Sequence, residues 1–273
     1  MKRIIVPVDF SEPSEYALKV AVSLAKKHDS EILALHMLEL SQGVFTSPEG
    51  PYIDQSVFFI ELAKKRFAEF LDKPYLKGIS ITPIIKHFKV FREVNEVAAQ
   101  HGADLVVIGS HGAEGLKEIF IGSNAQKVVR HSDIPVLVVK DDMPEFKVDH
   151  FVFASDFKDA DMNAYLKAND FARKLKAKIH LVYINIPGDS FLSHQDAQKR
   201  IDAFLSKAGA THHVQIYNDY SVEEGVLNFG ETINADLVGI PTHGRKGLSH
   251  FFMGSIGEDI VNHSKIPVVT FKI

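Results

Sequence analysis

Short apolar runs alternate with amphipathic stretches along the chain, and this alternation predicts strands separated by helices. The predicted strands of the first half cover residues 3–8, 31–37, 79–86, 104–108 and 135–139. Between them, residues 14–28 and 56–71 carry apolar side chains at the three- and four-residue spacing of helices. Because the strands are apolar almost throughout, we expect an α/β fold with a parallel sheet that helices cover on both faces.

The second half of the chain repeats the first. The segment "GADLVVIGSHG" at 102–112 aligns with "NADLVGIPTHG" at 234–244. The segment "HSDIPVLVVK" at 131–140 aligns with "HSKIPVVTFK" at 263–272, and both pairs are 132 residues apart. A shared offset over two separate segments indicates a duplicated domain.

Nearer the start of each copy the offset changes. "IIVPVDFS" at 4–11 aligns with "FVFASDFK" at 151–158, which is an offset of 147 residues. The first copy therefore carries about 15 extra residues, and the Gly-, Pro- and Ser-rich segment 41–55 predicts a loop at that place. We expect two domains, 1–141 and 147–273, separated by a charged stretch that contains a proline.

Composition narrows the function classes. The chain has 273 residues, 45% hydrophobic and 24% charged, which is typical of a globular protein. A net charge of −4 leaves no basic surplus for a nucleic-acid partner, and the lack of cysteine excludes disulfides and thiolate chemistry. No apolar run reaches the roughly 18 residues of a membrane helix, and the N-terminus enters a strand pattern directly. We expect a cytoplasmic protein without a membrane partner.

A glycine-rich loop follows the fourth predicted strand of each copy. In the first copy it is "GSHGAEGLKEIFIGS" (109–123), with four glycines, and in the second "PTHGRKGLSHFFMGS" (241–255). Ligands of parallel sheets bind at the carboxyl ends of the strands, where this loop lies. Backbone N–H groups in such a loop, and the helix N-terminus after it, attract anions. Ser123 fits two roles there, a phosphate contact or an ordinary helix cap.

The spacing of the loop separates it from other nucleotide motifs. Neither a Walker P-loop nor a G-x-G-x-x-G after the first strand is present. The pattern G-x-x-G-x₉-G-S, together with "VPVDFS" at the first strand and "IPVLVV" at the last, resembles the universal stress protein family in its ATP-binding branch. The resemblance spans nearly the whole chain. It implies two tandem doubly wound domains of the adenine nucleotide alpha hydrolase-like type, each with a five-stranded parallel sheet, and final strands paired across the halves.

The resemblance also implies a ligand, an adenine nucleotide (ATP, ADP or AMP), with or without magnesium. Pro7, Val8 and Asp9 match the segment that lines adenine and ribose, and Asp9 is expected to accept a ribose hydroxyl. Met37 matches the position whose backbone contacts the adenine edge. The matching phosphate contacts are Gly109, His111, Gly112, Gly122, Ser123 and Asn124.

The second copy keeps part of this set. The matching candidates there are Asp156, His243, Gly244, Gly254 and Ser255. Pro241 replaces the first glycine and Ala154 replaces Pro7, and since proline has no N–H, one phosphate donor is missing. Arg245 and Lys246 bring positive charge near the loop or are solvated surface charges.

Other side chains give no reason to expect catalysis or a metal. His131 and His263 occupy matching positions near the end of the last helix, where a cation favours the helix dipole, so we expect helix-end stabilisation. His212 and His213 are adjacent and would point to opposite faces of a strand. We therefore predict no catalytic and no metal-binding residue.

The function expected from these features is that of a nucleotide-responsive stress or signalling module. The alternatives are a slow ATPase, or a duplicated interaction scaffold that has lost ligand binding. Because oligomers are common among soluble proteins, the chain is expected to form a homo-oligomer. The sequence does not identify a protein partner.

Overall fold

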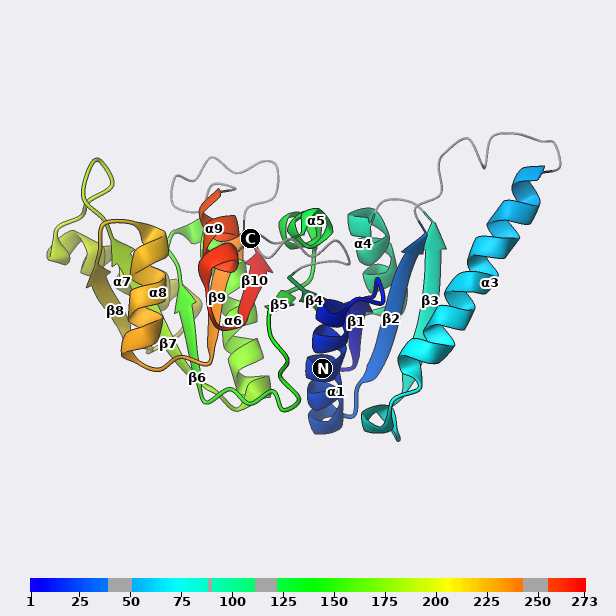
Figure 1. Ribbon diagram of the computed structural model, residues 1–273. Coiled ribbons are helices and arrows are strands. Elements are labelled where there is room, and N and C mark those ends of the chain that lie inside the picture. The colour runs from blue at the N-terminus through cyan, green and yellow to red at the C-terminus, as the bar shows by residue number, and fades with distance from the viewer. Residues whose placement is uncertain (39–50, 88–89, 111–121, 243–254) are drawn as a thin grey trace. The chain divides into compact units, whose positions relative to one another are not determined.

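The computed structural model describes residues 1–38, 51–87, 90–110, 122–242 and 255–273. The chain divides into two compact units (Figure 1). Among the described residues, the first unit comprises those up to Ser110, Gly122–Ile134 and Val139–Phe146, and the second comprises Pro135–Val138 and those from Lys147 onward.

Strands and helices alternate in the first copy, as the apolar pattern predicts. Its elements are β1 (Arg3–Pro7), α1 (Glu12–His28), β2 (Glu31–Leu38), α3 (Pro51–Leu71), the 3-10 turn η1 (Pro74–Leu76), β3 (Ile81–His87), α4 (Val90–His101), β4 (Leu105–Gly109), α5 (Ser123–His131) and β5 (Val136–Val139). Strand β1 lies between β2 and β4 and is parallel to both, and β3 follows beyond β2. Helix α1 packs on β1 and β4, and α4 packs on β1 and α5.

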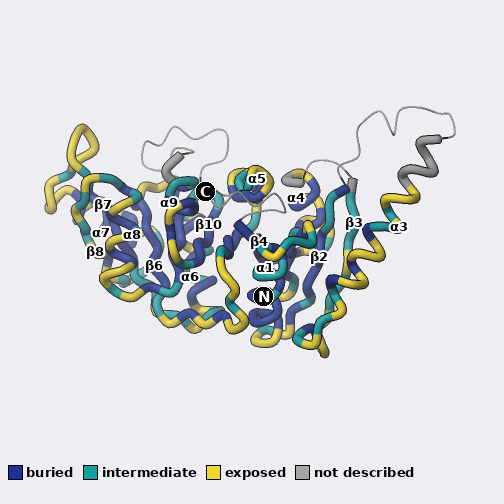
Figure 2. The backbone as a smooth tube through the Cα atoms, viewed as in Figure 1, coloured by how far each residue is buried: buried dark blue, intermediate teal, exposed yellow. Residues whose placement is uncertain are grey.

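The second copy has the same order. Its elements are β6 (His150–Ala154), the 3-10 turn η2 (Asp159–Asp161), α6 (Met162–Leu175), β7 (Lys178–Asn185), α7 (His194–Ala208), β8 (Val214–Asn218), α8 (Val222–Thr232), β9 (Leu237–Thr242), α9 (Ser255–His263) and β10 (Val268–Lys272). The parallel strands are arranged β8, β7, β6, β9, β10. Figure 2 shows that the central strands are buried, which explains their continuous apolar sequence.

The two final strands are paired, as the resemblance implies. Strand β5 runs antiparallel to β10, with Val136 opposite Thr270 and Val138 opposite Val268. Within the second unit, this pairing extends the sheet beyond β10 by the strand that ends the first sequence copy. Valines on both strands are buried where the strands pair: Val138 and Val268 are each 1% exposed.

The prediction of a loop over 41–55 needs correction, and the burial of α3 changes along its length. Residues 51–55, expected as part of a loop, are the first turns of this helix, and 41–50 lie outside the described residues. The apolar stripe is core only in its second half, where Phe67 and Phe70 are buried, whereas Phe58 is 62% exposed. A helix of 21 residues is about 31 Å long, more than the roughly 23 Å of the seven-residue β3, so the sheet cannot cover all of it.

Candidate functional site

The carboxyl ends of β1 and β4 meet at one edge of the first unit, because the two strands are parallel neighbours. After β1 the chain stays attached to β2, where the Val8 N–H donates to the Leu35 carbonyl at 2.8 Å. Asp9 follows and is exposed, and its Oδ1 accepts the Ser11 N–H at 3.0 Å and the Ser11 hydroxyl. Ser11 is also the N-cap of α1. The carboxylate is therefore fixed by the helix start and still reaches solvent.

Phe10 anchors this turn in a conformation that is unusual for a bulky residue. Its φ is +66°, and its ring packs on His36 at 4.5 Å and on Phe67 at 5.2 Å between centroids. His36 Nδ1–H donates to the Val8 carbonyl over 2.7 Å. Burial, helped by the nearby Arg66 charge, lowers the pKa of His36, so the neutral ring is favoured. The turn that presents Asp9 is thus held from behind by an aromatic cluster.

This lowered pKa of His36 makes the turn sensitive to acid. Below pH 6.5, the usual value for histidine, the unfolded chain binds the proton more readily than the folded chain, so stability should fall with pH. We expect His36→Gln to lose less folding stability at acid pH than the wild type, because glutamine keeps an N–H donor but does not titrate. Urea unfolding at pH 7.5 and 5.5 measures it, with exposed His213→Gln as control. Equal acid losses in wild type and His36→Gln would contradict the assignment.

The end of β4 and the start of α5 form the other side of the edge. Gly109 lies so close to α1 that a Cβ there would stand 2.4 Å from the Pro13 carbonyl oxygen. Ser110 is fully buried, its N–H donates to the Val139 carbonyl, and its own carbonyl accepts the Gly122 N–H at 2.6 Å. The last hydrogen bond draws the N-terminus of α5 against the end of β4.

Gly122, and not Ser123, is the N-cap of α5. Ser123 is the first helical residue, so the ordinary-cap interpretation of Ser123 is wrong. Both Ser123 and Asn124 are exposed. Their position at the N-terminus of a helix places their N–H groups where the helix dipole favours an anion. Met37 lies half-buried on β2, two strands from β4.

Several predicted contacts fall outside the described residues. These are His111, Gly112, His243, Gly244 and Gly254, together with Arg245 and Lys246. Ser255 is the first residue of α9, which corresponds to Ser123 in α5. The roles of all these residues as ligand contacts stay predictions.

The corresponding edge of the second unit differs in its side chains. Asp156 is 1% exposed, and its carboxylate pairs with Lys158 Nζ at 2.6 Å. Phe157 repeats the left-handed turn of Phe10 with φ of +51° and is fully enclosed. Pro241 is buried inside β9.

The start of the helix that follows the first strand also differs between the two units. Asp159 corresponds to Glu12, the first residue of α1, but α6 begins three residues later at Met162, after the turn η2. The first turn of α1, which approaches Gly109 in the first unit, is therefore replaced by the turn η2 in the second.

The histidine predictions have mixed outcomes. His131 and His263 are the last residues of α5 and α9; His131 Nδ1–H donates to the Lys127 carbonyl over 2.9 Å, and His263 pairs with Glu223. Both contacts fit a role at the helix end. His212 precedes β8 instead of lying in a strand, and its Nδ1 bonds the Tyr165 hydroxyl at 2.7 Å. Among the described residues, no group of three or more metal-ligating side chains is present.

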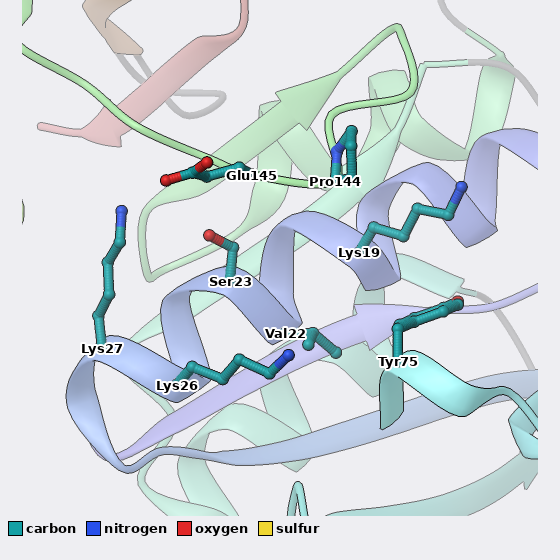
Figure 3. A pocket seen from close by; sticks show the side chains of 8 residues that line it. All are labelled: Lys19, Val22, Ser23, Lys26, Lys27, Tyr75, Pro144 and Glu145. Carbon is teal, nitrogen blue, oxygen red and sulfur yellow. The ribbon is translucent and has the colours of Figure 1, made fainter. Parts of the chain in front are cut away.

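A hollow of about 320 Å³ lies elsewhere, along the outer side of α1 (Figure 3). Its lining residues are Lys19, Val22, Ser23, Lys26, Lys27, Tyr75, Pro144 and Glu145. Lys19 pairs with Asp142 at 2.7 Å and Lys27 donates to the Phe146 carbonyl at 2.6 Å, so two of its three lysines fix the chain after β5. None of the predicted nucleotide contacts lines it.

Comparison with known proteins agrees with this architecture. The model of the universal stress protein family matches residues 1–140 and again 147–272. A universal stress protein of Methanocaldococcus jannaschii is 34% identical over 143 residues, which are 51% of this chain and 82% of the relative. One of Mycolicibacterium smegmatis is 23% identical over 292 residues, covering 98% of this chain and 96% of the relative.

The fold also matches a solved structure over nearly the whole chain. The crystal structure of a universal stress protein from Archaeoglobus fulgidus covers 99% of this chain and 96% of its own, with a TM-score of 0.67 at 24% identity. The chain belongs to the universal stress protein family and carries two tandem domains of it. In the part of the chain that the structure describes, no helix is long and apolar enough to cross a membrane.

Proposed function

We propose that the first unit binds an adenine nucleotide at the edge formed by the ends of β1, β2 and β4. The nucleotide state would then control the conformation or the partner of the protein, which requires that the two states differ in nucleotide affinity. This places the protein among nucleotide-responsive stress or signalling modules. Cytoplasmic location and self-association belong to the same proposal.

The observation that carries the proposal is that an exposed carboxylate, Asp9, and the exposed start of α5 follow the carboxyl ends of two neighbouring parallel strands, β1 and β4. A carboxylate accepts hydrogen bonds from the two hydroxyls of a ribose, and a helix N-terminus favours phosphate. The tight contact between Gly109 and Pro13 and the Gly122–Ser110 hydrogen bond fix the phosphate side. A nucleotide bound in the orientation that the family resemblance implies would have its ribose at Asp9 and its phosphates at the start of α5.

Replacing Asp9 tests the ribose contact. We expect Asp9→Asn to weaken ATP binding by roughly 10- to 100-fold, because a hydrogen bond to a charged group contributes about 1.5–3 kcal/mol. Calorimetric titration with ATP measures the change. Asp72→Asn removes the same charge from an exposed residue just after α3 and should leave affinity unchanged. ATP affinity that is equal in the wild type and in Asp9→Asn would contradict the assignment of Asp9.

A further inference from the structure

The two copies differ systematically at the six positions where strands one and two end. In the second unit every one of these residues is 1% exposed: Ala154, Ser155, Asp156, Phe157, Tyr183 and Ile184. In the first unit only one of the corresponding six residues is buried: Pro7, Val8, Asp9, Phe10, His36 and Met37. The edge that is accessible in the first unit is therefore closed in the second.

A second carboxyl group, that of Asp161, lies beside Asp156 at this edge of the second unit. Asp161, in η2, is 1% exposed, accepts the Ser155 hydroxyl at 2.7 Å and bonds to Asp156. Two carboxyl groups in buried contact cannot both be charged. Burial and the neighbouring Asp156 raise the pKa of Asp161 to about 8. Although burial opposes it, the bonds from Asp161 and Lys158 hold the pKa of Asp156 below its usual range.

The groups around the pair complete the enclosure. Lys158 neutralises Asp156 from the same loop, and Arg200 of α7 lies 5.9 Å from the centre of the Tyr183 ring on β7. Phe157 packs edge-on against Phe204 of α7 at 5.4 Å. Side chains from the same loop and from α7 thus pack on the residues of this edge.

The first unit has no equivalent of this pair. Ser14 occupies the position of Asp161 when the copies are aligned, and its hydroxyl donates to the Ser11 carbonyl at 2.9 Å. Asp9 therefore stays exposed beside the helix start. At the aligned positions, Asp161 replaces Ser14 and Lys158 replaces Ser11.

We propose that the second unit carries a self-occupied counterpart of the nucleotide site, in which the ammonium group of Lys158 and the buried carboxyl group of Asp161 take the place of the ribose hydroxyls. The chain then binds one nucleotide, in the first unit. This inference rests on the proposed function for its stoichiometry, but the closed pair itself does not. Asp156, predicted from the resemblance as a ligand contact, acts here as a structural residue.

Matched variants of the two copies test the stoichiometry. Calorimetric titration with ATP should give one site per chain in the wild type, and Asp156→Asn should leave both the number of sites and the affinity within twofold. Two sites per chain, one of them lost in Asp156→Asn, would overturn the inference. Asp161→Asn, which keeps a donor to Asp156 and an acceptor for Ser155, serves as the second variant if Asp156→Asn does not fold.

Infrared spectroscopy of the nucleotide-free protein tests whether Asp161 carries a proton. The wild type at pH 7 should show a protonated carboxyl stretch that disappears above pH 8 and is missing from Asp161→Asn. Its absence at pH 7 would overturn the closed pair. A wild type that binds no ATP yet shows the band would contradict the proposed function and leave the closed second edge supported.

Discussion

Gly109→Val is expected to destabilise the first unit by on the order of 3 kcal/mol and to abolish nucleotide binding. A Cβ at this position would stand 2.4 Å from the oxygen and 2.6 Å from the carbon of the Pro13 carbonyl. These are backbone atoms of the first turn of α1, so the helix start, and with it the turn that holds Asp9, must move. Stability and binding should therefore be lost together. Chemical denaturation and ATP titration measure the two effects.

Gly230→Ala is the matched control. It also adds a Cβ to a buried glycine, but the nearest atoms, on Ala235 and Val238, are 3.8 Å and 3.9 Å away. Because this glycine lies within α8, alanine should stabilise it by up to about 1 kcal/mol. If Gly109→Val does not fold, Gly109→Ala gives the milder version of the same clash. Unchanged ATP affinity in a folded Gly109 variant would show that the β4–α1 contact does not shape the site.

Asp161→Asn is expected to stabilise the second unit increasingly as pH rises from about 4 to 8. In this range the folded wild type keeps a proton on Asp161, with a pKa of about 8, that the unfolded chain releases near 3.8. The folded state binds one proton more, so wild-type stability falls with rising pH, by on the order of 1 kcal/mol per unit. Asparagine keeps both hydrogen bonds without titrating, so the fall should be reduced.

Denaturation of wild type and variant at pH 5, 6, 7 and 8 gives the slope. The neighbouring Asp159 is the control, because its side chain is 74% exposed and pairs with Lys207 at the surface. Asp159→Asn should change stability by less than about 1 kcal/mol at every pH. A gap between wild type and Asp161→Asn that stays constant with pH would mean that Asp161 holds no proton in the folded protein.

The fold was predictable because its causes are local and repeated. Apolar runs such as β4, in which all five residues are buried, define the strands, and the duplication confirms the pattern in a second context. The beginning of α3 was missed because Pro51 stands at its start in a segment rich in turn residues. Proline suits the first turn of a helix, so the same residue fits a loop and a helix start.

The candidate site was predictable only where spacing in the chain carries it. The glycines at 109 and 122 and the aspartate after β1 follow from the motif. The aromatic cluster behind Asp9 does not follow from the motif. Its members Phe10, His36 and Phe67 come together only because β2 and α3 pack against each other. Likewise, nothing in the spacing of Asp156 and Asp161 indicates that η2 turns the second carboxyl back onto the first. The difference between the two copies is therefore a tertiary effect.

Amide chemical shifts recorded during a titration with ATP test the central claim most directly. The account predicts shifts at Gly122, Ser123 and Asn124, at the start of α5, and at Val8, which directly precedes Asp9. The amides of Ser155 and Phe157, at the closed edge of the second unit, should stay unchanged. If the amide chemical shifts of Gly122, Ser123 and Asn124 stayed unchanged at saturating ATP, the account would be contradicted.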